Sequence, residues 1–331
     1  MGSLAGLQSF QIHKNLLSGV FPTNLKKNNQ LILLDLGENN LSGTIPPWVG
    51  EKLLNMKILC LRSNNFSGHI PNEICDMSLL QVIDLAENHL SGNIPTCFNK
   101  LSVMTLRNKS RHSFIYSESP YTTSYTLRYG MVNILLWLKG AGIEYKNILG
   151  LVTSIDLSWN KLTREITREI TALDGLIYLN LSKNQLSSQI PPSIGNMRLL
   201  ESIDISKNQL SGEIPLTISN LSFLNHLNLS YNHLKGKIPT GIQIQSFEAS
   251  NFVGNNLCRP PLLINCSSNQ QSPYIDQTKN GEHGVNWFFV SMTLGFVVGF
   301  WLIIAPLFIR SWRYAYFCFL DDTWYKLQSC W

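Results

Sequence analysis

Charged residues are scarce in this 331-residue chain, and no stretch of it is strongly basic. Only 14% of the residues are Asp, Glu, Lys or Arg, whereas about a quarter is usual for a soluble domain. The net charge is +5, but there is no Lys/Arg run of the kind that contacts nucleic acid. We therefore expect no nucleic-acid partner.

Sequence signatures of enzymes are also missing. The seven histidines are scattered, and the sequence has no H-E-x-x-H zinc motif and no P-loop. It has no G-x-S-x-G nucleophile motif and none of the protein-kinase elements. The short Lys139-Gly-Ala-Gly142 segment is too weak a pattern to indicate a nucleotide. We therefore predict a non-enzyme with no catalytic residue, no metal and no cofactor.

The N-terminus lacks a targeting pattern. MGSLAGLQSF has neither the basic region nor the long apolar core of a secretory signal. Gly6 stands where a myristoylation site has Ser or Thr. Leu7, Phe10, Ile12 and Asn15 already fit the repeat described next. We therefore expect an array that begins without a cap, as in an N-terminally truncated product.

The dominant feature of the chain is a phrase that recurs about every 24 residues. Asn208-Gln-Leu-Ser-Gly-Glu-Ile-Pro215 is followed by Asn232-His-Leu-Lys-Gly-Lys-Ile-Pro239. The pattern L-x-x-L-x-L precedes most copies of a marker Asn, as in Leu224/Leu227/Leu229. This is the leucine-rich-repeat pattern. The marker residues are Asn15, Asn39, Asn64, Asn88, Asn160, Asn184, Asn208, Asn232 and Asn256.

The repeat predicts an α/β solenoid. L-x-L alternation makes a short strand with one inward face, and stacked coils place these strands side by side in one parallel sheet on the concave face. The marker Asn carries both an NH2 donor and a carbonyl acceptor, so it can satisfy backbone groups where the coil turns. One coil cannot bury its own apolar face, so neighbours must cover both flanks.

The second half of the repeat makes the resemblance specific. L-S-G-x-I-P and close variants recur at Leu41–Pro46, Phe66–Pro71, Leu90–Pro95 and Leu210–Pro215. The chain resembles the plant-type leucine-rich repeats of extracellular receptors. Two copies depart from this pattern, because Arg164 and Ser188 replace the Gly and Thr167 replaces the Pro. We expect altered convex turns there.

An apolar segment near the C-terminus predicts one transmembrane helix. Trp287–Ile309 contains 23 residues and no charge, which as a helix is about 35 Å long against a hydrocarbon core of about 30 Å. Arg310 and Arg313 follow it, which places the C-terminus in the cytoplasm and the repeats outside. The alternative is a buried core helix. Gly295-x-x-x-Gly299 would allow close approach of a second helix.

The membrane segment and tail carry a second resemblance. GFVVGFW followed by SWRYAYFCFLDD is similar to the junction of plant receptor-like proteins, of the fungal-xylanase receptor kind, which lack a kinase domain. This resemblance implies that Gly295 and Gly299 contact a partner receptor kinase within the bilayer. The alternative is that glycine is simply common in such helices.

With the repeats placed outside the cell, disulfides and glycosylation are expected features of the array. Ser246–Cys266 resembles the family's C-terminal cap, which implies a Cys258–Cys266 disulfide. Cys75 and Cys97 follow I-P in adjacent coils, where a disulfide or two buried thiols are both compatible with the pattern, and Cys60 has no predicted partner. Glycosylation sequons occur at Asn40, Asn65, Asn108, Asn180, Asn220, Asn228 and Asn265.

The repeat pattern is missing between Asn88 and Asn160, which are three 24-residue periods apart. We interpret residues 103–149 as an inserted island; two degenerate coils are the alternative. Leu136–Ser158 resembles the island's end in receptor-like proteins, which implies a receptor-function role for Lys139 and Tyr145. Both residues could instead be ordinary surface and packing residues.

The concave face offers a candidate contact surface. Between the apolar strand residues stands a polar ladder that we expect to form hydrogen bonds within the coils: Gln11, Asp35, Cys60, Asp84, Asp156, Asn180, Asp204 and Asn228. Immediately before the marker Asn, we expect outward strand residues at Lys14, Glu38, Ser63, Glu87, Trp159, Lys183, Lys207 and Tyr231. The last four form a basic-aromatic row typical of interface anchors, and the resemblance implies a co-receptor contact at these membrane-proximal repeats.

These observations predict a single-pass plasma-membrane glycoprotein that binds an extracellular peptide or protein. The resemblance implies that it signals through a partner receptor kinase, in plant defence. The alternatives are a developmental peptide receptor, a leucine-rich-repeat inhibitor of a microbial wall-degrading enzyme, and a receptor kinase lacking its kinase domain. The predicted parts are repeats 1–102, island 103–149, repeats 150–245, cap 246–266, juxtamembrane linker 267–286, membrane helix 287–309 and cytoplasmic tail 310–331.

Overall fold

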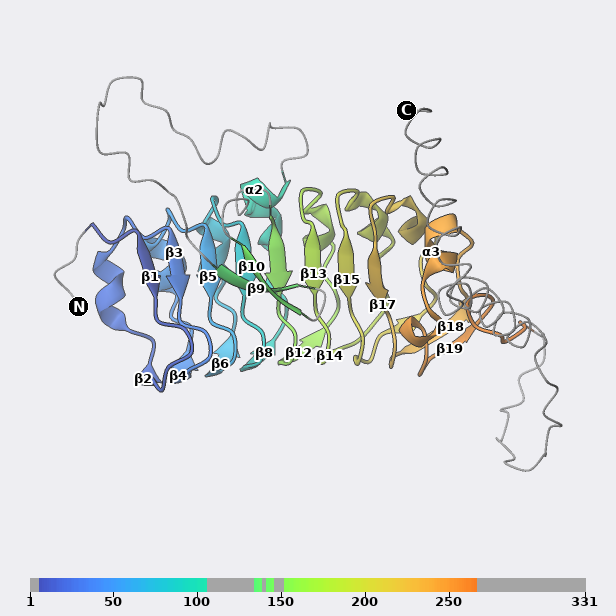
Figure 1. The fold of residues 1–331 in the computed structure, drawn as a ribbon, viewed down its shortest axis with the longest axis horizontal. Helices are drawn as coiled ribbons and strands as arrows, with labels where there is room; N and C mark the ends of the chain where they lie inside the picture. Colours follow the sequence, from blue (N-terminus) through green and yellow to red (C-terminus); the bar gives the residue numbers. More distant parts are fainter. Residues whose placement is uncertain (1–5, 106–133, 139–140, 146–151, 267–331) are drawn as a thin grey trace, which may run out of the picture. The chain divides into compact units, whose positions relative to one another are not determined.

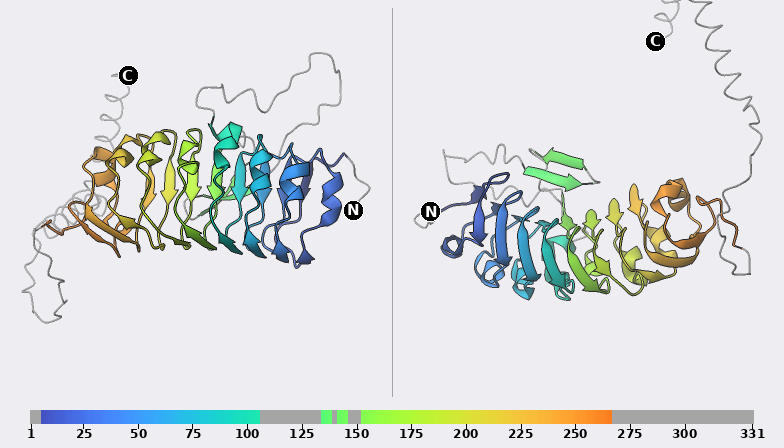
Figure 2. Two further views of the ribbon diagram at one scale, coloured as in Figure 1. Left: turned by 180° about the vertical axis from the view of Figure 1, so that it is seen from behind. Right: turned by 90° about the horizontal axis from the view of Figure 1, so that it is seen from below.

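The computed structural model describes residues 6–105, 134–138, 141–145 and 152–266. The repeats form a stack of coils built from short strands and turns, with one coil per repeat (Figures 1 and 2). The inner strands form one parallel sheet in the order β1-β3-β5-β7-β11-β13-β15-β17. These strands are Ser9–Gln11, Leu33–Asp35, Ile58–Cys60, Val82–Asp84, Ser154–Asp156, Tyr178–Asn180, Ser202–Asp204 and His226–Asn228. The predicted leucine-rich solenoid with parallel strands is confirmed.

A second set of parallel strands lies in the L-S-G-x-I-P half of the coils. One sheet has the order β14-β12-β8-β6-β4-β2 and a shorter one the order β16-β18-β19. Their bounds are β2 Ser18–Val20, β4 Asn40–Thr44, β6 Asn65–His69, β8 His89–Gly92, β12 Lys161–Arg164, β14 Gln185–Leu186, β16 Ser211–Gly212, β18 His233–Lys237 and β19 Asn256–Cys258. This second row of strands was not predicted from the sequence.

Short helical turns follow the Ile-Pro dipeptide in most coils. Proline fixes φ and lacks an N–H, so it suits the residue that precedes a helical turn. The 3₁₀ turns are Thr23–Lys27, Asn72–Asp76, Phe98–Lys100, Ile170–Ala172, Pro192–Asn196, Leu216–Asn220 and Ala249–Asn251. The α-helical turns are α1 Trp48–Lys52, α2 Ser102–Thr105 and α3 Ile242–Ser246. Between strands and turns runs one apolar core, from Phe21 to Leu257.

The marker asparagines join the coils as the donor and acceptor chemistry predicts. Nδ2 of Asn208 donates to the carbonyls of Leu181 in the preceding coil and of Ile205 in its own coil, at 3.0 and 3.2 Å. Its Oδ1 accepts the N–H of Leu186 at 3.0 Å. The same arrangement recurs at Asn39, Asn64, Asn88, Asn160, Asn184 and Asn232.

In the cap, Asn255 rather than Asn256 takes this place, which corrects the sequence-based assignment. Nδ2 of Asn255 donates to the Leu229 carbonyl at 3.0 Å, and its Oδ1 accepts the N–H of Leu234 at 3.0 Å. Asn256 instead begins β19. The 24-residue period therefore shortens by one residue at the cap, where no strand pattern fixes it.

The two irregular repeats, for which altered convex turns were expected, keep the backbone conformation of the regular turns. Arg164 and Ser188 have φ of 65° and 76°, in the left-handed region that Gly43, Gly68 and Gly92 occupy in regular repeats. The outer sheet is interrupted next to Ser188, where an isolated bridge between Gln189 and Ser211 replaces a continuous pairing of β14 with β16. The turn is thus retained without glycine.

The coils on either side of the inserted segment contact each other directly. β7 pairs with β11, with Val82 opposite Ser154, and β8 pairs with β12. Such pairing leaves no room for two degenerate coils between them. Met104 and Val152 are both buried, so the solenoid continues beyond residue 102, to at least Thr105. Within the insertion, β9 (Ile134–Leu138) and β10 (Ala141–Tyr145) form an antiparallel hairpin.

Two disulfides join parts of the array. Cys75 and Cys97 link adjacent coils, with Cα atoms 5.8 Å apart, and Cys258 and Cys266 close a loop in the cap. Cys60 is the free cysteine of the described part of the chain, and it is buried.

No helix within the described ranges has the length and apolarity to cross a membrane. The predicted span Trp287–Ile309 lies outside those ranges.

Candidate functional site

The residue before each marker Asn adopts the same unusual backbone conformation. In all eight coils this residue has a φ between 51° and 57°. The turn directs its N–H at the next coil; Trp159, for example, donates to the Ser182 carbonyl at 3.0 Å. Sequence reasoning placed these residues in the strands, whereas they lie in the turn just beyond them. An uncommon left-handed conformation for a large side chain is thus imposed by stacking.

Four of these residues, Trp159, Lys183, Lys207 and Tyr231, form the basic-aromatic row. The strands that precede them are neighbours in register, from β11 to β17. The Lys183 Nζ lies 3.4 Å from the centroid of the Trp159 ring, and the Lys207 Nζ lies 5.6 Å from that of Tyr231. Lys183 therefore faces the ring of Trp159, and Lys207 faces the ring of Tyr231. Both contacts are attractive cation–π arrangements.

The row is open to solvent. Trp159 and Tyr231 are 53% and 55% exposed, large fractions for aromatic side chains. Burial and the neighbouring Lys207 ammonium both lower the pKa of Lys183. No carboxylate within the described part of the chain forms an ion pair with either lysine. The row can therefore accept an acidic group flanked by apolar or aromatic surface.

In the strands that precede the row, the polar ladder forms the hydrogen bonds within the coils that the sequence predicts. Asp156 Oδ1 accepts the N–H of Ser158 at 3.0 Å, and Asp204 Oδ1 accepts that of Ser206 at 2.9 Å. Asn180 links neighbouring coils by donating to Asp156 Oδ2 at 3.3 Å. These side chains brace the turns that carry the row.

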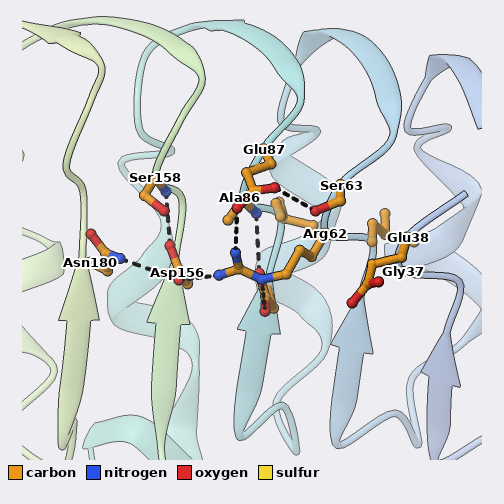
Figure 3. Close-up of polar contacts among 12 residues, drawn as sticks. Gly37, Glu38, Arg62, Ser63, Ala86, Glu87, Asp156, Ser158 and Asn180 are labelled. Carbon is orange, nitrogen blue, oxygen red and sulfur yellow. Dashed lines mark hydrogen bonds and ion pairs between the residues drawn. The ribbon is translucent and has the colours of Figure 1, made fainter. Parts of the chain in front are cut away.

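Arg62 forms a buried ion cluster that sequence reasoning missed (Figure 3). Its Nε donates to Asp84 at 2.8 Å and its Nη1 to Glu87 at 3.0 Å, while Nη2 donates to Asp156. Glu87 also accepts the Ser63 hydroxyl at 2.6 Å. Asp84 and Asp156 lie on the two strands that flank the insertion, so this cluster joins its two ends.

A signal for this cluster was present in the sequence. Arg62 lies two residues after a ladder position. From β3 to β17, the other residues in this column are Gly37, Ala86, Ser158, Ser182, Ser206 and Ser230. A lone Arg among such small residues, with aspartates in the following coils, indicates an ion pair between coils. The residue spacing alone did not show that Asp156, 94 residues away, is one of its partners.

Burial dominates the electrostatics of the cluster. Burial raises the pKa of Asp84 to about 7, against the lowering effect of the Arg62 guanidinium. Burial also raises the pKa of Asp156. Two carboxylates that share one guanidinium in a site of low dielectric retain protons that they would lose in water. Burial raises the pKa of the nearby Cys60 thiol as well.

Some of the remaining predicted site residues lie outside the described ranges, and the others lie within them. Lys139, Asn108, Gly295 and Gly299 are outside the described residues, and Tyr145 pairs with Ile134 in the hairpin. Among the sequons, Asn40, Asn65, Asn220 and Asn265 are exposed, whereas Asn180 and Asn228 are half-buried in the ladder. Within the described ranges, no group of His, Cys, Asp and Glu could hold a metal ion.

Comparison with known proteins agrees with this architecture. The Leucine Rich Repeat family matches residues 30–51, 55–77, 79–101, 175–197, 199–221 and 223–243. Receptor-like protein EIX2 of Solanum lycopersicum is 53% identical over 313 residues, which are 90% of this chain and 30% of that protein. The chain therefore spans less than a third of this curated relative.

Two solved plant ectodomains share the fold. The Arabidopsis thaliana receptor kinase GASSHO1/SCHENGEN3, in complex with CASPARIAN STRIP INTEGRITY FACTOR 2, has a TM-score of 0.57 and 27% identity, covering 80% of this chain and 29% of that chain. The Arabidopsis receptor kinase HAESA, in complex with the peptide hormone IDA and the co-receptor SERK1, has a TM-score of 0.51 and 28% identity, covering 76% and 38%. The six matched repeats and the sequence identity together show that this chain is a leucine-rich-repeat protein similar to plant receptor-like proteins.

Proposed function

We propose that this chain is part of a cell-surface receptor that binds an extracellular peptide or protein and signals, in plant defence, through a partner receptor kinase. The observation that carries this proposal is the open row of Trp159, Lys183, Lys207 and Tyr231. Exposed aromatic side chains and paired cations are typical of recognition surfaces. The braced coils beneath them supply a rigid support, as binding sites require.

The structural neighbours support a division of roles along the array. HAESA is a receptor kinase solved with both a peptide and a co-receptor. By analogy, we assign a ligand or co-receptor contact to the row and to the insertion residues Lys139 and Tyr145. Acidic or carboxylate-bearing partners fit best, because neither lysine of the row has a carboxylate partner within the described ranges.

The proposed route to the kinase is the membrane helix Trp287–Ile309, with the repeats extracellular and the C-terminus cytoplasmic. Gly295 and Gly299 would lie on one helix face, four residues apart, and leave room for a partner helix. Binding of a ligand by the repeats would favour assembly with a kinase that supplies the phosphotransfer.

Co-precipitation of the full-length chain from plant membranes tests this function. We expect receptor kinases in the precipitate of the natural chain and a several-fold loss with Gly295→Leu/Gly299→Leu. Thr293→Leu is the matched control, because two residues along a helix place the new side chain on the opposite face. Unchanged kinase recovery with the double variant would refute the helix contact, and no kinase in any precipitate would refute the signalling route.

A further inference from the structure

The glycosylation sequons share a tripeptide but lie in two different structural settings. Asn40, Asn180, Asn220 and Asn228 each begin an Asn-Leu-Ser sequence. Asn65, which begins Asn-Phe-Ser, occupies the position of Asn40 in the next coil. A glycosyltransferase that reads the tripeptide treats the Asn-Leu-Ser sequons alike. A difference in sugar occupancy among them therefore has to come from the fold.

The sequons at Asn180 and Asn228 are closed on themselves in the ladder. Oδ1 of Asn180 accepts both the N–H and the hydroxyl of its own sequon serine, Ser182, at 3.1 and 2.8 Å. Its Nδ2 donates to Asp156 Oδ2 at 3.3 Å (Figure 3). Asn228 forms the equivalent hydrogen bonds within its own coil and with the preceding coil. Nδ2, the atom that a glycan needs, is thus already engaged between two coils.

The inner sheet leaves little room for a sugar at these positions. Asn180 is in register with Asp156 on one side and Asp204 on the other, and neighbouring strands are about 4.8 Å apart. Asn180 and Asn228 are both half-buried. A sugar on Nδ2 of Asn180 displaces the Asp156 carboxylate, and a buried polar group that loses its partner costs about 1 to 3 kcal/mol. Glycosylation in the ladder therefore opposes stacking of the coils.

The sequons at Asn40 and Asn65 face solvent from the outer sheet. Asn40 begins β4 and Asn65 begins β6. Both asparagines are exposed, whereas the next residues, Leu41 and Phe66, are buried, as alternation along a strand requires. Their sequon serines donate to carbonyls of the preceding coil, at 3.3 and 3.4 Å. Neither sequon is therefore closed on its own asparagine.

The sequon at Asn220 lies on an open turn. Asn220 is exposed at the end of the 3₁₀ turn Leu216–Asn220. Large side chains on either side of it in the sequence are also open to solvent, since Leu216 is 76% exposed and Phe223 59%. The surface around Asn220 thus has room for a sugar.

We propose that Asn40, Asn65 and Asn220 carry N-glycans and that Asn180 and Asn228 do not. The sugars then cover part of the outer sheet and one turn, and the ladder stays bare. This assignment rests on the extracellular placement of the repeats in the proposed function. It also deepens that function, because a bare ladder leaves the neighbouring basic-aromatic row accessible to a partner.

The modification is a transfer from a lipid-linked oligosaccharide pyrophosphate to the asparagine amide. The bond between sugar C1 and the pyrophosphate oxygen breaks, and a bond between C1 and Nδ2 forms. The amide proton leaves with the lipid pyrophosphate. Because transfer can precede folding, the fold selects among chains that are already modified. A chain with a sugar on Asn180 stacks poorly, whereas one with a sugar on Asn40 stacks normally.

Site occupancy in the full-length chain from plant membranes tests the assignment. Peptide-N-glycosidase A in heavy-oxygen water converts each glycosylated asparagine to a labelled aspartate, which peptide mass spectrometry quantifies. A sample without the enzyme corrects for spontaneous deamidation. We expect label at Asn40, Asn65 and Asn220 in most molecules, and several-fold less at Asn180 and Asn228. Equal label at Asn180 and Asn40 would overturn the assignment alone, whereas no label at any sequon would overturn the extracellular placement as well.

A transplanted sequon separates the effect of the fold from that of the tripeptide. Gln185→Asn creates a further Asn-Leu-Ser in the same coil as Asn180, at the outer-sheet position that corresponds to Asn40. Gln185 is exposed. We expect the new site to be glycosylated to the same extent as Asn40, while Asn180 on the same chain stays unmodified. Sugar at both sites of this coil, or at neither, would contradict selection by the fold.

Discussion

At the scale of single residues, proton binding by the Arg62 cluster makes stability depend on pH. The folded-state pKa of Asp84 is about 7, against 3.8 for the unperturbed group, and that of Asp156 is also raised. The folded protein therefore binds more protons than the unfolded chain between about pH 4 and pH 7, so stability falls as pH rises through this window. The cluster favours an acidic medium.

We predict that the free energy of unfolding decreases by about 2 kcal/mol between pH 5.5 and pH 8, as measured by urea denaturation. Asp84→Asn should flatten this dependence, because the amide cannot lose the proton whose release destabilises the fold. Asp204→Asn changes the same ladder position in β15, far from Arg62, and serves as the control. A natural chain whose stability rises over this pH range would contradict the prediction.

A second residue-scale prediction concerns left-handed turns without glycine. Ser188 has a φ of 76°, where other repeats have Gly212 at 81° or Gly236 at 88°. Glycine enters this region without steric cost, whereas other residues pay about 1 kcal/mol or more. Ser188→Gly should therefore stabilise the protein by about 1 kcal/mol, because the relieved strain exceeds the added entropy of the unfolded chain.

The matched control is the reverse change at the regular turn. A Cβ on Gly212 would lie 2.9 Å from the Gln189 side chain, so Gly212→Ala should destabilise by about 1 to 2 kcal/mol. Thermal unfolding of both variants is the measurement. Destabilisation by Ser188→Gly would show that the hydroxyl or the stiffer chain outweighs the strain.

At the scale of elements, the Cys75–Cys97 disulfide joins the turns of two adjacent coils covalently. It closes a loop of 22 residues, and loops of this size restrict the unfolded chain enough to give about 3 kcal/mol of stability. Cys75→Ala/Cys97→Ala should lower the free energy of unfolding by about that amount. Native hydrogen exchange should show the largest loss of protection in β6 and β8. An unchanged midpoint in urea would contradict this role.

At the scale of the whole molecule, the direct β7–β11 and β8–β12 pairings make the insertion dispensable for stacking. A solenoid derives its stability from interfaces between neighbouring coils, and the β7–β11 and β8–β12 pairings are made by residues outside 106–151. We predict that the chain with Gly-Gly in place of residues 106–151 unfolds in urea in a single transition, like the natural chain. Two separate transitions would show that the halves are joined through the insertion.

The sequence by itself determined the features that repeat. A local sequence pattern sets the 24-residue period, the L-x-L strands and the marker asparagines. Every coil has the same apolar face to bury and the same backbone groups to hydrogen-bond, so the same pattern recurs. Asn208 could be assigned its role from its residue type alone. Asn255 could not, because the cap has no second copy with which to compare it.

Only the tertiary structure decided the contacts between coils that differ in sequence. Stacking brought Asp156 to Arg62, 94 residues away in the sequence. It also placed Trp159 and Tyr231 in left-handed turns and buried Val82 on the side of the sheet away from the core. These outcomes depend on which coils become neighbours once the insertion is looped out, and a periodic sequence carries no local signal for that choice. The reason is physical: contacts within a coil are set by short-range backbone geometry, whereas contacts across the insertion are set by register and by burial of the whole sheet.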